Sequence, residues 1–312
     1  MTASNRSPVV LCHAACSGGS LIYRLMVSTF GFSGLAEIGH GRRTAFGFSP
    51  VDPEAQMFSL GDIDHQEFGA ILTARLVSAN KFANQIDKLL LIREHTHNYF
   101  FNPDGPEIVP DGPSWVADQF ENHVEFDSLP VVVSVRDPVD SWLGFRQNFN
   151  HLDPVCFDDY CRRYNQFFDR VEQWKGLGKP IHVFKYEDCV VAPEKTLREL
   201  AEFLNLEYTG LDLSKASTTA SSGNSGRQSA SLGLRKRRPF TMSLVNAASG
   251  SSDYASLCAR LGYPLLHSSL TTSDRFSATC HSMLSPLRKV GSMAEAPGRW
   301  VYNLIKSGRG IQ

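Results

Sequence analysis

Residues 8–26 decide the fold of this chain, and they read PVVLCHAACSGGSLIYRLM. Val9–Cys12 is a continuous apolar run, which predicts a short buried strand. A turn of small residues follows, and apolar side chains then recur at helical spacing over Leu21–Met26. A strand, a tight small-residue turn and a helix together form the layout of a phosphate-binding loop.

Two glycines and two serines give this turn its capacity to bind an anion. Gly18 and Gly19 let the backbone approach an anion closely, and the helix N-terminus offers N–H groups and a positive dipole end. Ser17 and Ser20 add hydroxyl donors. The alternative is an ordinary strand-to-helix turn with a serine or asparagine cap, so the rest of the chain has to decide.

The overall charge excludes a general attraction to polyanions. The chain has 312 residues, of which 42% are hydrophobic and 20% charged, and its formal net charge is −1. This composition is typical of a globular protein with a core. A net charge near zero gives no overall electrostatic attraction to nucleic acid or to a membrane surface. We therefore expect no nucleic-acid partner, and any anion has to be bound by a local cluster of charge.

The cysteines and the N-terminus bear on the cellular compartment. The seven cysteines show neither the paired spacing of a zinc site nor a disulfide framework, which favours a reducing compartment. Residues 1–7 are polar, and no apolar run approaches membrane-spanning length. We expect a soluble, cytoplasmic protein without a transmembrane segment.

Further apolar patterns alternate along the chain. Apolar runs predict strands at residues 35–38, 88–95, 129–138 and 181–186. Apolar side chains with a 3.6-residue period predict helices at 66–91, 115–124, 139–148, 157–174 and 193–205. Strands that alternate with helices form a parallel sheet covered on both faces. The sequence therefore predicts an α/β fold with three layers around a central parallel sheet.

Polar side chains stand at the ends of these strands. Parallel sheets bind ligands beyond the carboxyl ends of their strands. The predicted strands deliver Arg93, His95, Arg136 and Tyr186 to that edge, beside the glycine turn. Four strand ends that supply polar groups to one edge favour a binding site there over a structural coincidence.

The remaining segments are less regular. Long loops at residues 39–64 and 98–113 are expected to shape an acceptor site. Arg42 and Arg43 in the first loop fit either an anionic or saccharide acceptor or plain solvated surface. Residues 213–231 have the composition of a linker. Residues 240–312 are expected to be helical at 254–261 and 299–305, and these helices are candidates for an oligomer interface.

Four segments in order resemble the sulfotransferases that use 3′-phosphoadenosine 5′-phosphosulfate (PAPS). They are Cys16-Ser17-Gly18-Gly19-Ser20-Leu21 for the 5′-phosphosulfate, Arg136–Ser141 for the 3′-phosphate, Phe184–Glu194 for the strand and helix that follow, and Ser222-Gly223-Asn224-Ser225-Gly226-Arg227 for the segment that closes on the nucleotide. Each motif is weak alone, and the four in order are more specific. The resemblance implies a P-loop NTPase-like fold and a single sulfotransferase domain over 1–312, with its core at 8–240 and a helical extension at 241–312.

The resemblance also implies roles for individual residues. PAPS is the donor substrate and no metal is required. The residues from Cys16 to Leu21 bind the 5′ end, Arg136 and Ser141 bind the 3′-phosphate, and Tyr186 lies near the adenine. Surface ion pairing is the alternative for Arg136, and a core position is the alternative for Tyr186. The segment from Ser222 to Arg227 acts as a lid over the nucleotide.

His95 matches the family's catalytic base, which takes the proton of an acceptor hydroxyl. Histidine suits this task because its ordinary pKa is near neutrality. Arg93 occupies the basic position of the basic-x-His pattern. His97 is the rival base, two loop-surface histidines are the plain alternative, and strand alternation turns Glu94 to the opposite face.

Two positions depart from the family pattern. Cys16 stands where the family has a basic residue, so another cation has to stabilise charge at the 5′ end; Arg93, Arg24 and Arg227 are the candidates. Gly144 stands where the family has a serine on the 3′-phosphate helix, and Ser141, one turn earlier, is its substitute.

The sequence leaves the acceptor and two other functions open. The acceptor is a carbohydrate or another small or lipid-linked molecule with a hydroxyl group. A P-loop kinase-like phosphotransferase is the first alternative, although the loop lacks the lysine of such enzymes. A nucleotide-binding protein without catalysis is the second alternative, because Cys16 replaces a basic residue.

Overall fold

The computed structural model describes residues 6–14, 16–38, 57, 61–94, 96, 116–121, 128–148, 156–219, 232–234, 236–271, 277–279 and 282. The chain divides into two compact units, Met1–Lys236 and Arg237–Gln312. His95, His97, the segment from Ser222 to Arg227 and most of the two expected acceptor loops lie outside the described residues.

Five parallel strands form the sheet of the first unit. They are β1 (Val9–His13), β2 (Ser33–Ile38), β3 (Leu90–Glu94), β4 (Val131–Val135) and β5 (Ile181–Lys185). Their order is β2-β3-β1-β4-β5, with every neighbouring pair parallel. Leu11 of β1 pairs with Arg93 on one side and with Val132 on the other. The predicted parallel sheet is confirmed, and the glycine turn follows its central strand.

The composition of each strand reflects its place in the sheet. β1, β3 and β4 are buried along their whole length, because both of their faces are covered. β5 is at the edge of the order, and only Phe184 in it is fully buried. Continuous apolar runs therefore mark the central strands.

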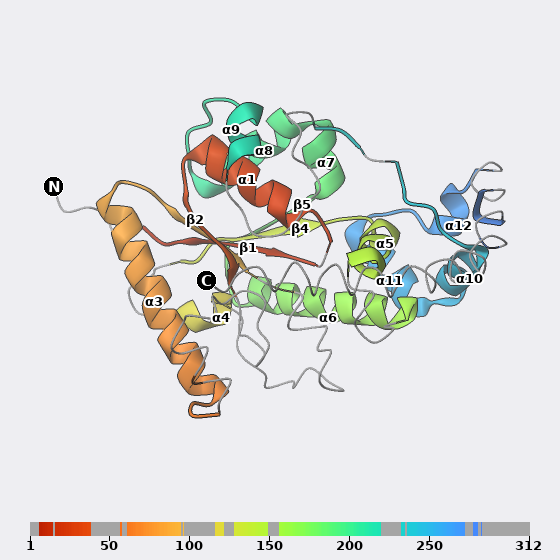
Figure 1. The fold of residues 1–312 in the computed structure, drawn as a ribbon, viewed down its shortest axis with the longest axis horizontal. Helices are drawn as coiled ribbons and strands as arrows, with labels where there is room; N and C mark the ends of the chain where they lie inside the picture. The colour runs from red at the N-terminus through yellow and green to blue at the C-terminus, as the bar shows by residue number, and fades with distance from the viewer. Residues whose placement is uncertain are drawn as a thin grey trace, which may run out of the picture. The chain divides into compact units, whose positions relative to one another are not determined.

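Helices cover both faces of the sheet (Figure 1). On one face lie α1 (Gly19–Phe30), α7 (Tyr186–Val191), α8 (Pro193–Leu204) and α9 (Leu213–Thr218). On the other lie α3 (His65–Gln85), α4 (Val116–Glu121) and α6 (Phe157–Gly176). α5 (Pro138–Asn148) packs against α6. The three-layer α/β arrangement predicted from the sequence is thus confirmed.

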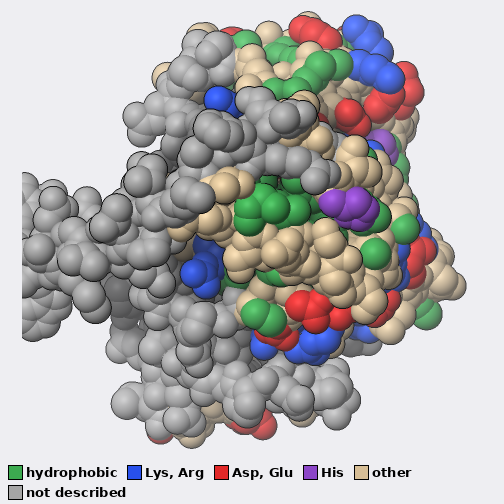
Figure 2. Space-filling model, turned by 90° about the vertical axis from the view of Figure 1, so that its right-hand side faces the viewer, with side chains coloured by type: hydrophobic (Ala, Val, Ile, Leu, Met, Phe, Trp, Pro, Cys, Tyr) green, Lys and Arg blue, Asp and Glu red, His purple; other side chains and the backbone are tan. Residues whose placement is uncertain are grey.

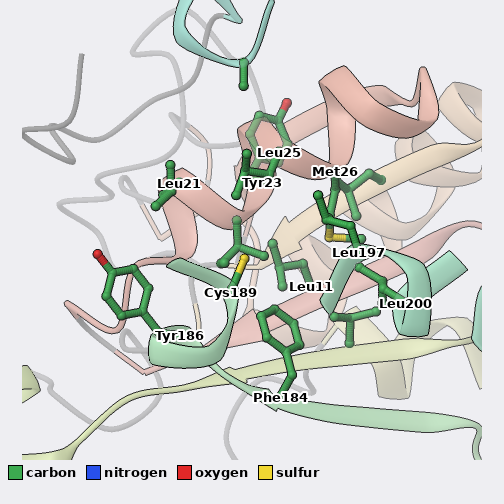
Figure 3. Close-up of a cluster of buried hydrophobic side chains, with 14 of the residues drawn as sticks. Leu11, Leu21, Tyr23, Leu25, Met26, Phe184, Tyr186, Cys189, Leu197 and Leu200 are labelled. Atoms are coloured by element: carbon green, nitrogen blue, oxygen red, sulfur yellow. The ribbon is translucent and has the colours of Figure 1, made fainter. Parts of the chain in front are cut away.

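The core between α1 and the sheet is apolar and closely packed (Figure 3). Leu11 of β1 and Leu25 and Met26 of α1 are fully buried. Leu197 and Leu200 join them from α8. Burying one such side chain stabilises the fold by about 1.5–3 kcal/mol, so this core fixes the position of α1 on the sheet.

An aromatic row connects α5 and α6 on the opposite face. The ring of Trp142 lies 5.4 Å from that of Tyr160, and Tyr160 lies 6.0 Å from Tyr164, centroid to centroid. Tyr160 and Tyr164 lie on one face of α6 because they are four residues apart. The row holds α5 in place directly after β4.

The second unit contains α10 (Met242–Gly250), α11 (Ser252–Leu261) and α12 (Leu266–Ser269). Its N-caps follow the common pattern, because Thr241 accepts from Leu244 N and Ser251 accepts from Tyr254 N. The helix expected at 254–261 is confirmed, whereas 299–305 lies outside the described residues.

Several predictions of local structure were wrong in part. The helix expected over 66–91 ends at Gln85, because Leu90 and Leu91 belong to β3, and the strand expected over 129–138 ends at Val135. Residues 213–218 of the expected linker form α9, because Asp212 caps it by accepting from Lys215 N, and α9 packs on α1. The strand expected over 181–186 ends at Lys185, and Tyr186 begins α7 instead. Among the helices that the structure describes, none has both the length and the hydropathy needed to cross a lipid bilayer.

Candidate functional site

The turn between β1 and α1 is held by hydrogen bonds between its own residues. Ser17 Oγ donates to the Ala14 carbonyl oxygen at 2.7 Å, and Leu21 N donates to the Gly18 carbonyl oxygen at 2.9 Å. Cys16 and Gly18 have positive φ angles of 61° and 93°. The turn is therefore tight, and only the glycine adopts its angle without steric strain.

The N-terminus of α1 is bare of side-chain caps. Gly18 caps the helix without a side-chain hydrogen bond, and the first turn holds no acidic residue. A helix leaves its first N–H groups without intrahelical partners, and its dipole makes this end positive. Gly18, Gly19 and Ser20 thus present their backbone to the carboxyl edge of the sheet in a form that suits an anion.

Arg136 reaches this turn from the end of β4. Its Nη1 donates to the Cys16 carbonyl oxygen at 3.1 Å, and its guanidinium lies over the Tyr186 ring at 4.9 Å. Within the part of the chain that the structure describes, its buried Nε has no hydrogen-bond partner. Two segments separated by 120 residues in sequence therefore meet at one place.

Tyr186 closes the other side of the turn. A Cβ on Gly18 would lie 2.2 Å from Cδ2 of the Tyr186 ring, so a side chain at this position does not fit. The ring itself is 5% exposed and belongs to the apolar core around α1 (Figure 3). Tyr186 thus combines a core position with a contact to the glycine turn.

Arg93 approaches α1 from the end of β3. Its Nη1 donates to Ser20 Oγ at 2.7 Å, and its guanidinium lies over the Tyr23 ring at 5.6 Å. The side chain is 1% exposed, and burial of a cation is stabilised by such polar and aromatic contacts. Of the cations expected to replace the basic residue missing at Cys16, Arg93 contacts the first turn of α1, whereas Arg24 lies one turn further along the helix and Arg227 is outside the described residues.

Glu94 lies on the opposite face from Arg93, as strand alternation predicts. Its carboxylate accepts from Cys12 Sγ at 3.1 Å and from Val116 N at 2.6 Å. Burial, and then the charge of Glu94, raise the pKa of the Cys12 thiol well above its usual value, so this thiol stays protonated. Glu94 therefore ties β3 to β1 and to the start of α4.

The start of α5 is organised by Asp137. Its Oδ1 accepts from Val139 N at 2.9 Å and from Asp140 N at 3.0 Å, while Asp137 N donates to Glu187 Oε1 at 3.1 Å. Ser141 follows in the first turn and is fully buried. Its Oγ lies beside the phenol of Tyr160. Its hydroxyl is a second buried polar group beside Arg136.

Tyr160 belongs to α6, the helix predicted over 157–174 from its apolar periodicity. Burial raises the pKa of its phenol well above its usual value; Cys16 is among the neighbours that raise it, and the Ser141 hydroxyl lowers it. The phenol of Tyr160 therefore lies beside the Ser141 hydroxyl at the start of α5. Apolar periodicity predicts that its ring faces inward, and only the tertiary packing brings its hydroxyl beside Ser141.

Some of the predicted site residues meet at one edge of the sheet, and others bond within the turn. Residues 16–20, Arg93, Arg136 and Tyr186 meet at one edge of the sheet. Ser17 turns its hydroxyl into the turn, and Leu21 turns its side chain into the core and uses its N–H within the turn. These two residues therefore build the turn rather than present donors to its outer side.

The fold is similar to that of sulfotransferase domains of known structure. A sulfotransferase domain from the curacin biosynthetic pathway matches 83% of this chain and 99% of its own chain, with a TM-score of 0.50 and 14% identity. The sulfotransferase domain of the Synechococcus PCC 7002 olefin synthase matches 83% of this chain and 97% of its own, with a TM-score of 0.46 and 15% identity. A mouse sulfotransferase complexed with PAP matches 70% of this chain and 71% of its own, with a TM-score of 0.36 and 13% identity.

No protein-family model and no curated protein matches the sequence. The likeness to the curacin domain extends over nearly all of that domain. The resemblance stated from the four sequence segments is therefore confirmed at the level of the fold: this chain has a sulfotransferase fold around its parallel sheet.

Proposed function

We propose that this protein is a sulfotransferase that moves a sulfuryl group from PAPS to a hydroxyl group of a small-molecule or saccharide acceptor. One observation carries the proposal: the glycine turn, Arg93 and Arg136 converge beyond the carboxyl ends of β1, β3 and β4. Two guanidiniums beside a bare helix N-terminus suit a ligand with two separate anionic groups. PAPS has these groups in its 3′-phosphate and its 5′-phosphosulfate.

The buried donors beside β4 support the fit of this ligand. Arg136 Nε has no hydrogen-bond partner among the described residues, and the buried Ser141 Oγ lies beside the Tyr160 phenol. An unsatisfied buried polar group costs about 1–3 kcal/mol, which an incoming phosphate would recover. In this proposal Arg136 and Ser141 hold the 3′-phosphate, Cys16 and residues 18–20 hold the 5′ end, and Tyr186 contacts the adenine.

The transfer exchanges one sulfur–oxygen bond for another. The bond between sulfur and the 5′-phosphate oxygen breaks, a bond to the acceptor oxygen forms, and the hydroxyl proton passes to a base. Negative charge builds on the leaving oxygen in a loose, in-line transition state. Arg93 is the cation for this charge, because it is buried at Ser20 and little screened by water.

His95 is the proposed base and His97 its rival. Histidine accepts a proton efficiently near neutral pH, and His95 follows Arg93 at the spacing of the family pattern. The segment from Ser222 to Arg227 is proposed to close over the nucleotide, with Arg227 adding a third guanidinium. The acceptor is proposed to bind beside residues 39–64 and 98–113.

The transferase core is proposed to span residues 8–240, with a helical extension at 241–312 that offers a surface for oligomerisation. The six described cysteines are free thiols, which supports the proposal of a reducing, cytoplasmic compartment. Described side chains of both charges are interspersed on the face drawn in Figure 2. The formal net charge of −1 supports a small-molecule acceptor over a nucleic-acid partner.

Two measurements test the proposal. Calorimetric titration with PAP, the desulfated product, is expected to show binding without a metal ion. Radiolabelled sulfate is then expected to move from PAPS to a hydroxyl in a panel of carbohydrates, lipids and phenols. Binding of ATP with Mg²⁺ in place of PAP would favour the kinase alternative, and PAP binding without transfer to any acceptor would favour a non-catalytic nucleotide-binding protein.

The base is tested by two matched variants. His95→Ala is expected to abolish turnover while PAP still binds, because the base acts on the acceptor rather than on the nucleotide. His97→Ala is the control and is expected to retain turnover. Full activity in His95→Ala with loss in His97→Ala would move the role to the rival.

A further inference from the structure

The imidazole ring of His13 lies where a side chain on Gly19 would be. A Cβ on Gly19, the first residue of α1, would lie 2.2 Å from both Cδ2 and Nε2 of the His13 ring. The ring is 7% exposed. The imidazole and the missing side chain of Gly19 are therefore fitted to each other at the N-terminus of the helix.

The contacts of His13 define how its ring is oriented. Its Nδ1 lies 3.0 Å from the Ala14 carbonyl oxygen, and its backbone N–H donates to Thr96 Oγ1 at 3.1 Å. A carbonyl oxygen only accepts, so this contact requires a hydrogen on Nδ1. In the neutral ring Nε2 then carries the lone pair, and Nε2 and Cδ2 form the edge of the ring that faces Gly19.

Strand alternation puts His13 on the same face of the sheet as the proposed donor site. Leu11, two residues earlier, belongs to the core beneath α1, and side chains two apart on a strand share a face. Ser134 of β4 pairs with His13 in the register of the sheet. The Ser134 side chain is fully buried, and its Oγ has no hydrogen-bond partner among the described residues. A second buried polar group therefore stands beside the imidazole and points to a ligand there.

The charges around this corner act on the protonation of His13. The elements packed here present Arg93 from β3, Arg136 from β4, Tyr23 and Arg24 from α1, Cys16 from the turn and Tyr186 from α7. Asp137 after β4 and Glu187 on α7 bring carboxylates to the same segments, and Asp137 N donates to Glu187 Oε1. The guanidiniums of Arg93 and Arg136 contact the turn and the first turn of α1 themselves, and the N-terminus of α1 adds its positive dipole end. Like charges disfavour a second proton on the ring, and an anion at the same place favours it.

We propose that His13 is a proton-binding residue of the donor site: its imidazole is neutral in the free protein and takes up a proton when the anionic 5′ end of the nucleotide binds at the first turn of α1. The proton comes from the buffer and goes to Nε2. The imidazolium then supplies a hydrogen-bond donor and a positive charge near the position where Cys16 replaces a basic residue. This inference rests on the proposed function.

Proton uptake on binding is the quantity to measure. The full chain is titrated with PAP at pH 7.5 in two buffers that differ in ionisation enthalpy, which yields the number of protons taken up per nucleotide. The wild-type protein is expected to take up as much as about one proton at His13, besides the contribution of the phosphates of PAP. His13→Asn retains a donor for the Ala14 carbonyl and lacks Nε2, so its uptake is expected to fall to that of the phosphates alone.

The same titration gives the affinity. His13→Asn is expected to weaken PAP binding on the order of tenfold, the effect of losing one hydrogen bond to a charged group. His182→Gln is the matched control, since His182 is a half-buried histidine on the edge strand β5. It is expected to leave both the proton count and the affinity unchanged.

Nitrogen-15 spectra of the histidine rings give a second readout on the wild-type protein. His13 is expected to change from the neutral form with its hydrogen on Nδ1 to imidazolium when PAP is added. Equal proton uptake in wild type and His13→Asn, or a His13 ring that stays neutral with PAP bound, overturns the role of His13 alone. A wild-type protein that does not bind PAP overturns the proposed function as well.

Discussion

The helices α1 and α3 begin in opposite ways, and the difference separates a binding site from a structural one. Asp64 at the start of α3 accepts from Glu67 N at 2.8 Å, and the Glu67 side chain accepts from Asp64 N at 2.9 Å. This reciprocal pair satisfies the end of the helix with its own sequence. At α1, Gly18 supplies no side-chain bond, and the residues around it are His13, Arg93, Arg136 and Tyr186 from distant segments.

A local cap therefore serves stability, and a bare start surrounded by cations suits an anionic ligand. The contrast also explains why the two starts differ in what they tolerate. At α3 an exposed carboxylate can be exchanged for another cap at small cost. At α1 the backbone itself is in contact with an aromatic ring, so the cost of a change is steric.

The largest effect is expected from Gly18→Ala. A Cβ at this residue would lie 2.2 Å from the Tyr186 ring, and Gly18 has a positive φ of 93° that other residues adopt only with strain. The free energy of unfolding is therefore expected to fall by about 3 kcal/mol, and PAP binding is expected to be lost. Urea denaturation and calorimetry measure the two effects.

Gly31→Ala is the control for this variant. Gly31 also has a positive φ, 68°, but a Cβ there meets nothing within 4 Å, so it is expected to cost about 1 kcal/mol and to leave PAP binding intact. Equal losses of stability in the two variants would show that the ring of Tyr186 does not restrict the turn.

Arg136→Gln is expected to weaken PAP binding by about 100-fold, because two charge-assisted hydrogen bonds to a phosphate are lost. The free energy of unfolding is expected to change little, since Gln retains a donor for the Cys16 carbonyl. Arg146→Gln is the matched control on the exposed last turn of α5, where the guanidinium lies over the Trp142 ring. If both variants bind PAP as tightly as wild type, Arg136 has no part in the site.

Asp64→Ala is expected to lower the free energy of unfolding by about 1 kcal/mol, the usual cost of removing an N-cap. PAP affinity is expected to stay unchanged, because this cap stabilises α3 alone. Asp64→Asn, which also caps well, is expected to restore most of the stability. A loss of PAP affinity in Asp64→Ala would contradict the separation of the two helix starts.

The smallest effect is expected from His182 on β5. Burial lowers the pKa of this imidazole from 6.5, and its ring lies 5.2 Å from that of Phe203. The unfolded chain then binds the proton more tightly than the folded one, so the stability present above about pH 6.5 is lost as the pH falls.

His182→Gln is expected to reduce the difference in unfolding free energy between pH 7.5 and pH 5. Urea denaturation at the two pH values measures it, with His267→Gln on the exposed side of α12 as control. An unchanged pH dependence in His182→Gln would remove His182 as its source.

Much of the site could be predicted because its parts are local patterns. The apolar runs fixed the positions of β1, β3 and β4, and each run showed which residue follows it, so Arg93 and Arg136 were found without a structure. The sequence did not predict that Ser17 and Leu21 bond within the turn, because the order of residues does not show whether a hydroxyl or an N–H at a turn points inward or outward. His13 and Tyr160 were missed because their partners, Gly19 and Ser141, are recognised only through packing.

The sequence by itself determined the elements, since hydrophobic periodicity and strand-ending polar residues are properties of neighbours along the chain. Only the tertiary structure decided that β1 lies between β3 and β4, and hence that Arg93 and Arg136 flank one turn. The bond from Arg93 to Ser20 spans 73 residues and that from Arg136 to Cys16 spans 120. Contacts at such separations depend on how the whole core packs, and no local pattern of residues encodes them.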